Sequence, residues 1–201
     1  MHNLTTFTDD ENWSGGFYQL AIEVGDPDDD RLHRTLETLW VAARIEGCYA
    51  HRDKEPEDQP ELAPTIAALT EAGRLRGTVQ LPDGRRIVCV CAAIREVEGV
   101  DWLVFDLPLG ALGRTDRRIG GFPFGPDSGP SSLSWRRPID DWLADIGREI
   151  FKQVDFHLAL IGFEQSGEAY ARDLNGVAPE ERWAGYLLPH QGNLHYMPAN
   201  R

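Results

Sequence analysis

The segment at about residues 76–107 constrains the fold most strongly. It holds three apolar runs separated by Pro-Asp-Gly and by Glu-Gly, and apolar runs joined by tight turns predict a three-strand meander. The middle run is apolar on both faces, with Ile87, Cys89, Cys91 and Ala93 on one and Val88, Val90, Ala92 and Ile94 on the other. We therefore expect a central strand that is covered on each side.

Other strands are indicated on both sides of this meander. Residues 17–24 alternate, with Tyr18, Leu20, Ile22 and Val24 on one face and Gln19, Ala21 and Glu23 on the other. Strict alternation is typical of a half-buried strand. A short strand is predicted at 47–52, a doubly apolar strand at 156–163, and a hairpin around Gln191-Gly192-Asn193.

Two amphipathic helices are predicted, at about 28–45 and 138–154. The first carries Leu32, Leu36, Leu39, Trp40 and Ala43 at helical spacing. We expect Asp26 to cap it and Pro27 to occupy its first position. The second is expected to begin with Pro138 in its first turn. A short helix within 64–75 should end at Gly73.

The order of these elements predicts a single α+β domain with a mixed or mostly antiparallel central sheet. Strands and helices are mixed without a repeating strand–helix period. We expect a polar N-terminal arm at 1–15, followed by one domain at 16–201. A long loop is predicted at 110–134, and loops of this length inside a domain are functional or disordered in most cases.

The charge of the chain restricts its partners. The formal net charge is -13, which argues against nucleic acid and against anionic membranes. Residues 1–61 hold 15 acidic against 5 basic residues, so most of the excess lies in the first third. No membrane span or signal peptide is predicted. The 3 cysteines, an odd number, favour a cytoplasmic location.

Four aspartates between Asp26 and Asp30 invite a calcium interpretation. Position 6 of such a loop requires glycine but is Arg31, and Leu32 and Leu36 already belong to the helical stripe. Helix capping explains the stretch better, and its surplus charge forms an acidic surface with acids of the following linker. The candidate partner-binding acids are Asp26, Asp28, Asp29, Asp30, Glu55, Glu57 and Asp58.

A zinc site built from Cys48, His51, Cys89 and Cys91 is the second metal interpretation. Four such ligands suit tetrahedral zinc. The spacing lacks the usual tight knuckle, however, and the segment around Cys89 and Cys91 is typical of a core strand. We therefore predict no metal and no cofactor, and leave open whether these four residues converge.

Catalytic signatures are absent from the sequence. It contains no nucleophile elbow, phosphate-binding loop or His-Glu-x-x-His motif. His157 is expected on a buried strand, and His190 and His195 flank the last turn; a histidine–carboxylate pair formed by the fold stays open. Phe122 and Phe124, on the long loop, are further candidates for partner contact. Several arginines flank this loop, away from the expected acidic surface.

These features predict a non-catalytic, acidic protein-binding module. The profile (small, cytoplasmic, acidic, rich in tryptophan, α+β) is similar to that of immunity proteins, which neutralise bacterial toxins; this likeness of composition transfers no site. The expected partner is a basic protein, reached by electrostatic steering. The alternative is an enzyme or small-molecule-binding protein whose pocket is covered by residues 110–134. Whether the chain forms a homo-oligomer stays open.

Overall fold

A computed structural model describes residues 3–96, 99–119 and 132–201. Within them the chain forms a single α+β domain built on an eight-stranded antiparallel sheet in the order β2-β3-β4-β5-β1-β6-β7-β8. The strands are β1 (Phe17–Gly25), β2 (Glu46–Tyr49), β3 (Leu75–Gln80), β4 (Arg86–Arg95), β5 (Asp101–Pro108), β6 (Leu158–Phe163), β7 (Gly185–His190) and β8 (Asn193–Met197). The predicted fold class is confirmed.

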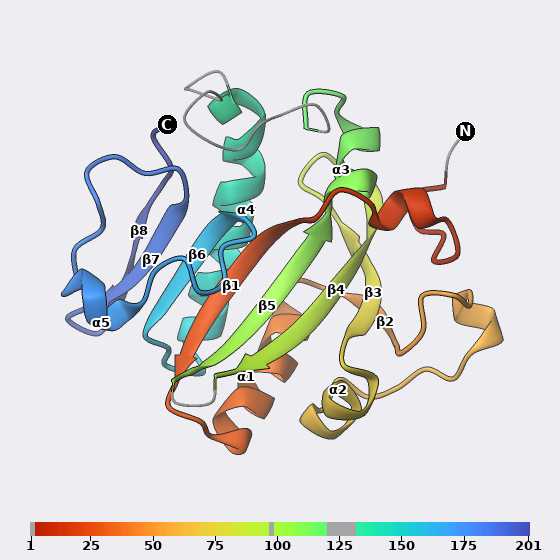
Figure 1. The fold of residues 1–201 in the computed structure, drawn as a ribbon, viewed down its shortest axis with the longest axis horizontal. Coiled ribbons are helices and arrows are strands. Elements are labelled where there is room, and N and C mark those ends of the chain that lie inside the picture. The colour runs from red at the N-terminus through yellow and green to blue at the C-terminus, as the bar shows by residue number, and fades with distance from the viewer. Residues whose placement is uncertain (1–2, 97–98, 120–131) are drawn as a thin grey trace.

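The helices are short apart from two. They are α1 (Asp29–Ala42), α2 (Ile66–Ala72), α3 (Leu109–Thr115), α4 (Leu133–Phe151) and α5 (Ala171–Leu174), with 3-10 turns η1 (Asp10–Trp13) and η2 (Pro56–Asp58). Figure 1 shows α1 and α4 behind the sheet, and the linker with η2 and α2 beside the β2–β3 edge. None of the described helices is long and apolar enough to span a membrane.

The face of the sheet behind which α1 and α4 lie is called the helix-covered face. Tyr18, Leu20 and Ile22 of β1 point to it and are completely buried. Helix α4 packs so closely that a Cβ atom at Gly147 would lie 2.7 Å from Leu187 Cδ1 of β7. Close packing of this kind makes the helix-covered face the main hydrophobic core.

The opposite, or open, face is covered mainly by irregular segments. At one end the N-terminal arm places Phe7 and Trp13 over the sheet, with their rings 5.8 Å apart. At the other end, the segment after β6 packs Tyr170 against Trp102, with ring centres 5.9 Å apart. The expected polar arm is therefore partly a core element, because its two aromatic rings are buried.

Strand β1 was expected to be half-buried, and this expectation is wrong. Gln19, Ala21 and Glu23 face the open side, yet all three are buried. The reason is topological: β1 pairs with β5 on one side and β6 on the other, so it lies at the centre of the sheet. Segments remote in sequence then cover its polar face.

The start of α1 differs from the predicted start by two residues. The helix begins at Asp29, and the cap is Asp28, whose side chain accepts a hydrogen bond from the Arg31 N–H at 3.0 Å. Asp26 and Pro27 precede the cap. Asp28 provides the extended backbone and the carboxylate that a cap requires, so the predicted cap at Asp26 is wrong.

Helix α4, unlike α1, starts earlier than predicted. It begins at Leu133, so Pro138 lies inside the helix rather than in its first turn. Proline in a helix interior removes one backbone donor. Packing of Trp135 and Ile139 against the core accompanies this early start, since both side chains are buried.

Two predicted turns are confirmed. Helix α2 ends at Gly73, which has a φ of 70°. Strands β7 and β8 are joined by Gln191 and Gly192, with φ values of 51° and 77°. Two successive residues with positive φ are typical of the tightest hairpin turns.

Candidate functional site

Acidic side chains are concentrated in two described segments, the N-terminal arm and the linker after β2. Glu55 of the linker accepts hydrogen bonds from the Phe7 N–H at 3.0 Å, the Thr8 N–H at 2.9 Å and the Thr8 hydroxyl at 2.6 Å. Burial opposes ionisation of Glu55, but these donors hold the pKa of its carboxyl below the ordinary value. Glu55 therefore fastens the arm to the linker.

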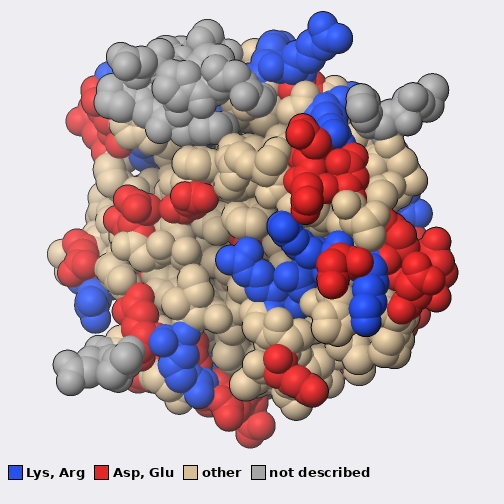
Figure 2. All heavy atoms as spheres, turned by 45° about the vertical axis from the view of Figure 1, so that its right-hand side comes forward, with Lys and Arg blue, Asp and Glu red and all other residues tan. Residues whose placement is uncertain are grey.

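This connection brings further carboxylates onto one surface, which we call the arm–linker surface. It is defined by the acidic residues Asp9, Asp10, Glu11, Asp53, Glu57, Asp58 and Glu61, most of which are exposed. Its cations are fewer. Arg52 lies 3.2 Å from Asp10, Arg114 lies 2.7 Å from Asp9, and Lys54 is in the linker. Figure 2 shows large groups of acidic side chains on the side brought forward there.

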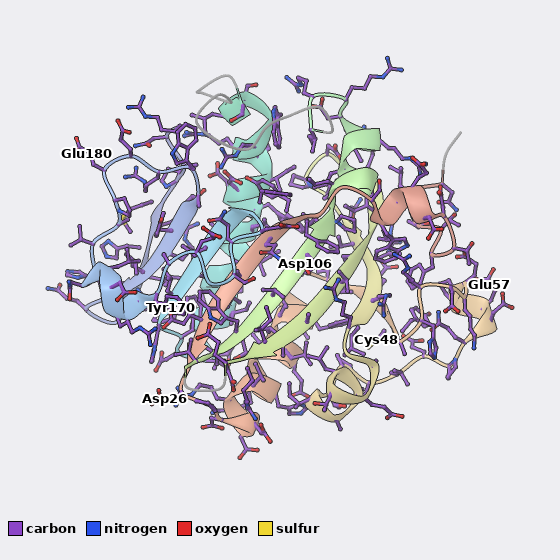
Figure 3. The ribbon with its side chains drawn as sticks, in the orientation of Figure 1. Asp26, Cys48, Glu57, Asp106, Tyr170 and Glu180 are labelled. Carbon is purple, nitrogen blue, oxygen red and sulfur yellow. The ribbon has the colours of Figure 1, made fainter. Side chains whose placement is uncertain are left out.

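The predicted partner-binding acids do not form one surface. Figure 3 places Asp26 beyond the end of β1, well away from Glu57 in the linker. Asp28 caps α1, and Asp29 pairs with Arg95 at 2.8 Å. Asp26 and Asp30 are exposed at the start of the helix. The structure thus places Glu55, Glu57 and Asp58 on the arm–linker surface and the four aspartates elsewhere.

The predicted loop candidates are only partly described. Phe122 and Phe124 lie outside the described residues. Before them, the expected irregular segment begins with α3 and continues to a turn in which Arg118 pairs with Asp116 at 2.6 Å. Arg114 contacts Asp9, so this arginine borders the arm–linker surface rather than lying away from it.

The three cysteines approach one another in the core. Cys48, Cys89 and Cys91 are all buried free thiols. Burial raises the pKa of the Cys48 thiol to about 12 and raises that of Cys89 and Cys91 as well. His51 is exposed and does not join them. No group of three or more potential metal ligands occurs among the described residues, and neutral thiols of this kind act as small apolar side chains.

Two histidine–carboxylate pairs occur among the described residues: His33 lies 3.4 Å from Glu37 on α1, and His157 lies beside Glu23 on the open face. His157 precedes β6, and its side chain is 50% exposed, so the expected buried position is wrong. Its Nδ1 lies 3.8 Å from Glu23 Oε1, longer than a hydrogen bond. Burial raises the pKa of Glu23, while the Ala171 N–H at 2.8 Å and His157 oppose this shift. His190 and His195 pack edge to face at 5.3 Å.

Three buried aspartates among the described residues were not predicted from the sequence. Asp101 is paired with Arg95, and the other two are Asp140 and Asp106. Asp140 of α4 accepts a hydrogen bond from the Tyr18 hydroxyl, which also accepts from Arg136 Nε at 3.0 Å. Asp106 of β5 lies on the open face beside Gln19. Burial raises the pKa of each of these two carboxyls to about 7. Asp106 falls in an apolar run, and Asp140 lies one helical turn before Leu143 and Ala144 on the buried side of α4. These positions could have identified both residues.

A hollow of about 690 Å³ lies on the other side of the molecule, between the end of α1, the β3–β4 turn and α4. Trp142 and Ile146 form part of its wall, and the acids Glu46, Asp145 and Glu149 line it. These acids already pair with Arg86, with Arg148 at 2.5 Å and with Lys152 at 2.6 Å. The hollow therefore carries little uncompensated charge.

Comparisons with known protein families, with curated proteins and with solved structures found no match.

Proposed function

We propose that this chain is a binding protein that attaches to a basic protein partner through the arm–linker surface. This proposal depends most on the hydrogen bonds that Glu55 accepts from the N-terminal arm, because they hold two acidic segments together. Seven further carboxylates then share this surface with Arg52, Lys54 and Arg114, and Arg76 lies at its border beside Arg52 and Asp53. A field of one sign concentrated on one surface accelerates the encounter with an oppositely charged protein.

The chain in this proposal acts by binding rather than by catalysis. An immunity-type or inhibitor-type role, in which the partner is a bacterial toxin, is one form of it. The assignment of Asp26, Asp28, Asp29 and Asp30 to the same interface stays a prediction. The alternative, an enzyme with a pocket under residues 110–134, depends on residues that lie outside the described part.

Charge reversal tests the surface directly. The variant Glu57→Lys/Asp58→Lys/Glu61→Lys should weaken binding of a labelled oligo-arginine peptide by about tenfold or more at low salt. Raising the salt to about 0.5 M should abolish most of the difference, because exposed charges are then screened. Fluorescence anisotropy measures both effects.

The matched control is Asp26→Lys/Asp30→Lys/Glu180→Lys, which changes the net charge equally but at other places (Figure 3). This control should retain most of the affinity. Equal losses in the two variants would show a response to net charge alone and would contradict the proposal.

A captured natural partner provides the second test. Carbodiimide joins carboxylates to lysines in direct contact, so cross-links should fall on Glu57, Asp58 or Glu61. Cross-links confined to Asp26–Asp30 would instead support the surface predicted at the start of α1. A partner that carries net negative charge would overturn the proposal.

A further inference from the structure

Asp106 has a buried carboxylate oxygen without a protein partner. The residue is 2% exposed, and its Oδ1 accepts no hydrogen bond from any described residue. Gln19, directly opposite on β1, donates its side-chain amide to this carboxylate. The Gln19 Oε1 accepts the Ser166 N–H at 3.3 Å, which orients the amide. One oxygen of this buried carboxylate thus has no hydrogen bond among the described residues.

An unsatisfied buried acceptor is costly, by about 1–3 kcal/mol, and is rare in folded proteins. Asp140 shows that this fold can satisfy a buried aspartate, since Tyr18 donates to it and Arg136 lies beside it. Asp106 differs in that its open oxygen faces the side of the sheet without the two long helices (Figure 1). The cost is explained if a ligand completes the site.

Arg74 extends over the same face. It precedes β3, yet its guanidinium carbon lies 5.3 Å from the ring centre of Phe17 on β1. Strands β4 and β5 separate β3 from β1 in the sheet, so the side chain passes over them. Arg74 is close enough to affect Asp106 electrostatically. Among the described residues, however, no carboxylate lies within 4.0 Å of the Arg74 guanidinium.

A second arginine lies beside Arg74. Arg76 pairs with Val90, and Val90 pairs with Asp106, so Arg76 is two strands from Asp106 in one row. Two strand spacings correspond to about 10 Å between their backbones. Arg76 Nη1 already donates to the carbonyl oxygens of Ala50 and Arg74, so Arg76 adds positive charge to this face rather than a free donor. Burial lowers the pKa of Arg76, and the charges of Arg74 and Arg52 lower it further. Figure 2 shows Lys and Arg side chains near the middle of this face, with Asp and Glu around them.

Negative charge lies on the other side of Asp106. Glu164 follows β6 and is exposed, and its negative charge raises the pKa of the Asp106 carboxyl. Arg74 immediately precedes β3 and Arg76 lies on it, whereas Asp106 lies on β5 and Glu164 immediately follows β6. The face therefore presents cations and carboxylates in two adjacent groups.

We propose that this face binds a small zwitterion of the amino-acid type, with its carboxylate held by Arg74 and its ammonium group by Asp106. Arginine side chains match carboxylates in shape and charge. A simple anion would be repelled by Asp106 and Glu164, and a simple cation by the arginines. Because Asp106 Oδ1 is buried, the side chains over it must move when the ligand enters.

Binding is tested with glycine, β-alanine and γ-aminobutyrate, which place the two charges at increasing separation. Acetate and ethylamine carry one charge each and serve as controls. Affinities are measured by isothermal titration and by shifts of backbone amide signals. At least one zwitterion should bind about tenfold more tightly than both controls. The shifted amides should include Gln19, Val90 and Asp106.

Two variants separate the roles. Arg74→Gln should weaken the zwitterion and acetate alike. Asp106→Asn should weaken the zwitterion about tenfold but strengthen acetate, because it removes a negative charge that repels the anion. Arg34→Gln, on α1 behind the sheet, should change neither. Equal affinity for zwitterions and controls in the unaltered protein, or shifts confined to other parts of the chain, would overturn the proposal without depending on how the variants fold.

Discussion

The two faces of the sheet show how differently a polar group can be accommodated in one fold. On the helix-covered face, apolar side chains pack under α1 and α4, and the single buried acid of α4, Asp140, is hydrogen-bonded by Tyr18. On the open face, Gln19, Glu23 and Asp106 are buried beneath irregular segments, and Asp106 keeps an unpartnered oxygen. Regular helices close one face completely, whereas loops leave functional groups within reach of a ligand.

The largest difference between the faces should appear in apolar truncations. Leu20→Ala, under the helices, should lower the free energy of unfolding by about 2–5 kcal/mol, because it leaves a cavity in a close-packed core. Ile94→Ala, at an open-face position that is 42% exposed, should lower the free energy of unfolding by no more than about 0.5–1 kcal/mol. Urea denaturation measures both. Equal losses would show that the open face is packed as tightly as the other.

Removal of the arm's attachment should expose the open face at one end. Glu55→Ala deletes the acceptor of two backbone N–H groups and one hydroxyl. Because these are hydrogen bonds to a charged group, the loss should be about 2–3 kcal/mol. Limited proteolysis should then cut the arm before Phe17. An arm that stays resistant in the variant would show that Phe7 and Trp13 hold it without Glu55.

The unpartnered acid should make stability depend on pH in a defined direction. The pKa of Asp106 is about 7 in the folded protein, above the value of about 3.9 for an unfolded aspartate. Between these values the folded state binds more protons, so stability falls as the pH rises and the loss is complete above about pH 7. Arg74 and Glu164 face this carboxyl and act in opposite directions.

Asp106→Asn removes this titration. Relative to the unaltered protein, the variant should gain about 1–3 kcal/mol at pH 8 and little at pH 4. Denaturation at several pH values measures the free energy of unfolding of both proteins. Subtracting one from the other at each pH removes the contributions of Asp140 and Glu23, which both proteins share. A variant that is less stable at pH 8 would mean that the charged carboxylate is satisfied after all.

The smallest effect concerns the first turn of α1, the helix that distinguishes the covered face. Asp28→Ala should cost about 1 kcal/mol, because the Arg31 N–H loses its acceptor. Asp26→Ala should stay within about 0.5 kcal/mol. Thermal unfolding of the two variants compares them. A larger loss of stability in Asp26→Ala than in Asp28→Ala would show that Asp26 is the cap.

The elements of the helix-covered face were predictable from sequence because periodicity reports them directly. Leu32, Leu36 and Leu39 mark one side of a helix, and the two-sided apolar run around Cys89 marks a central strand. Gly73 and the turn at Gly192 were predictable since few residues adopt positive φ. The early start of α4 was not, because core packing overrode the usual position of proline.

The candidate site was only half predictable. Glu57 and Asp58 lie together on the surface as expected, since both belong to one short charged linker. Their separation from Asp26 depends on where the chain returns after β2, and no local pattern carries that information. Asp106 and Arg74 come together only because β3, β4 and β5 pair side by side in the sheet. The register of the paired strands determines which side chains become neighbours, and the spacing of residues in the sequence does not reveal it.

The central position of β1 has a consequence for synthesis on the ribosome. This strand leaves the exit tunnel before either of its neighbours, β5 and β6, exists. Until they arrive, an apolar ribbon with two bare edges must avoid pairing with other nascent chains. Final closure of the molecule therefore waits for its last third, and fragments that end before β6 should be the ones that chaperones retain.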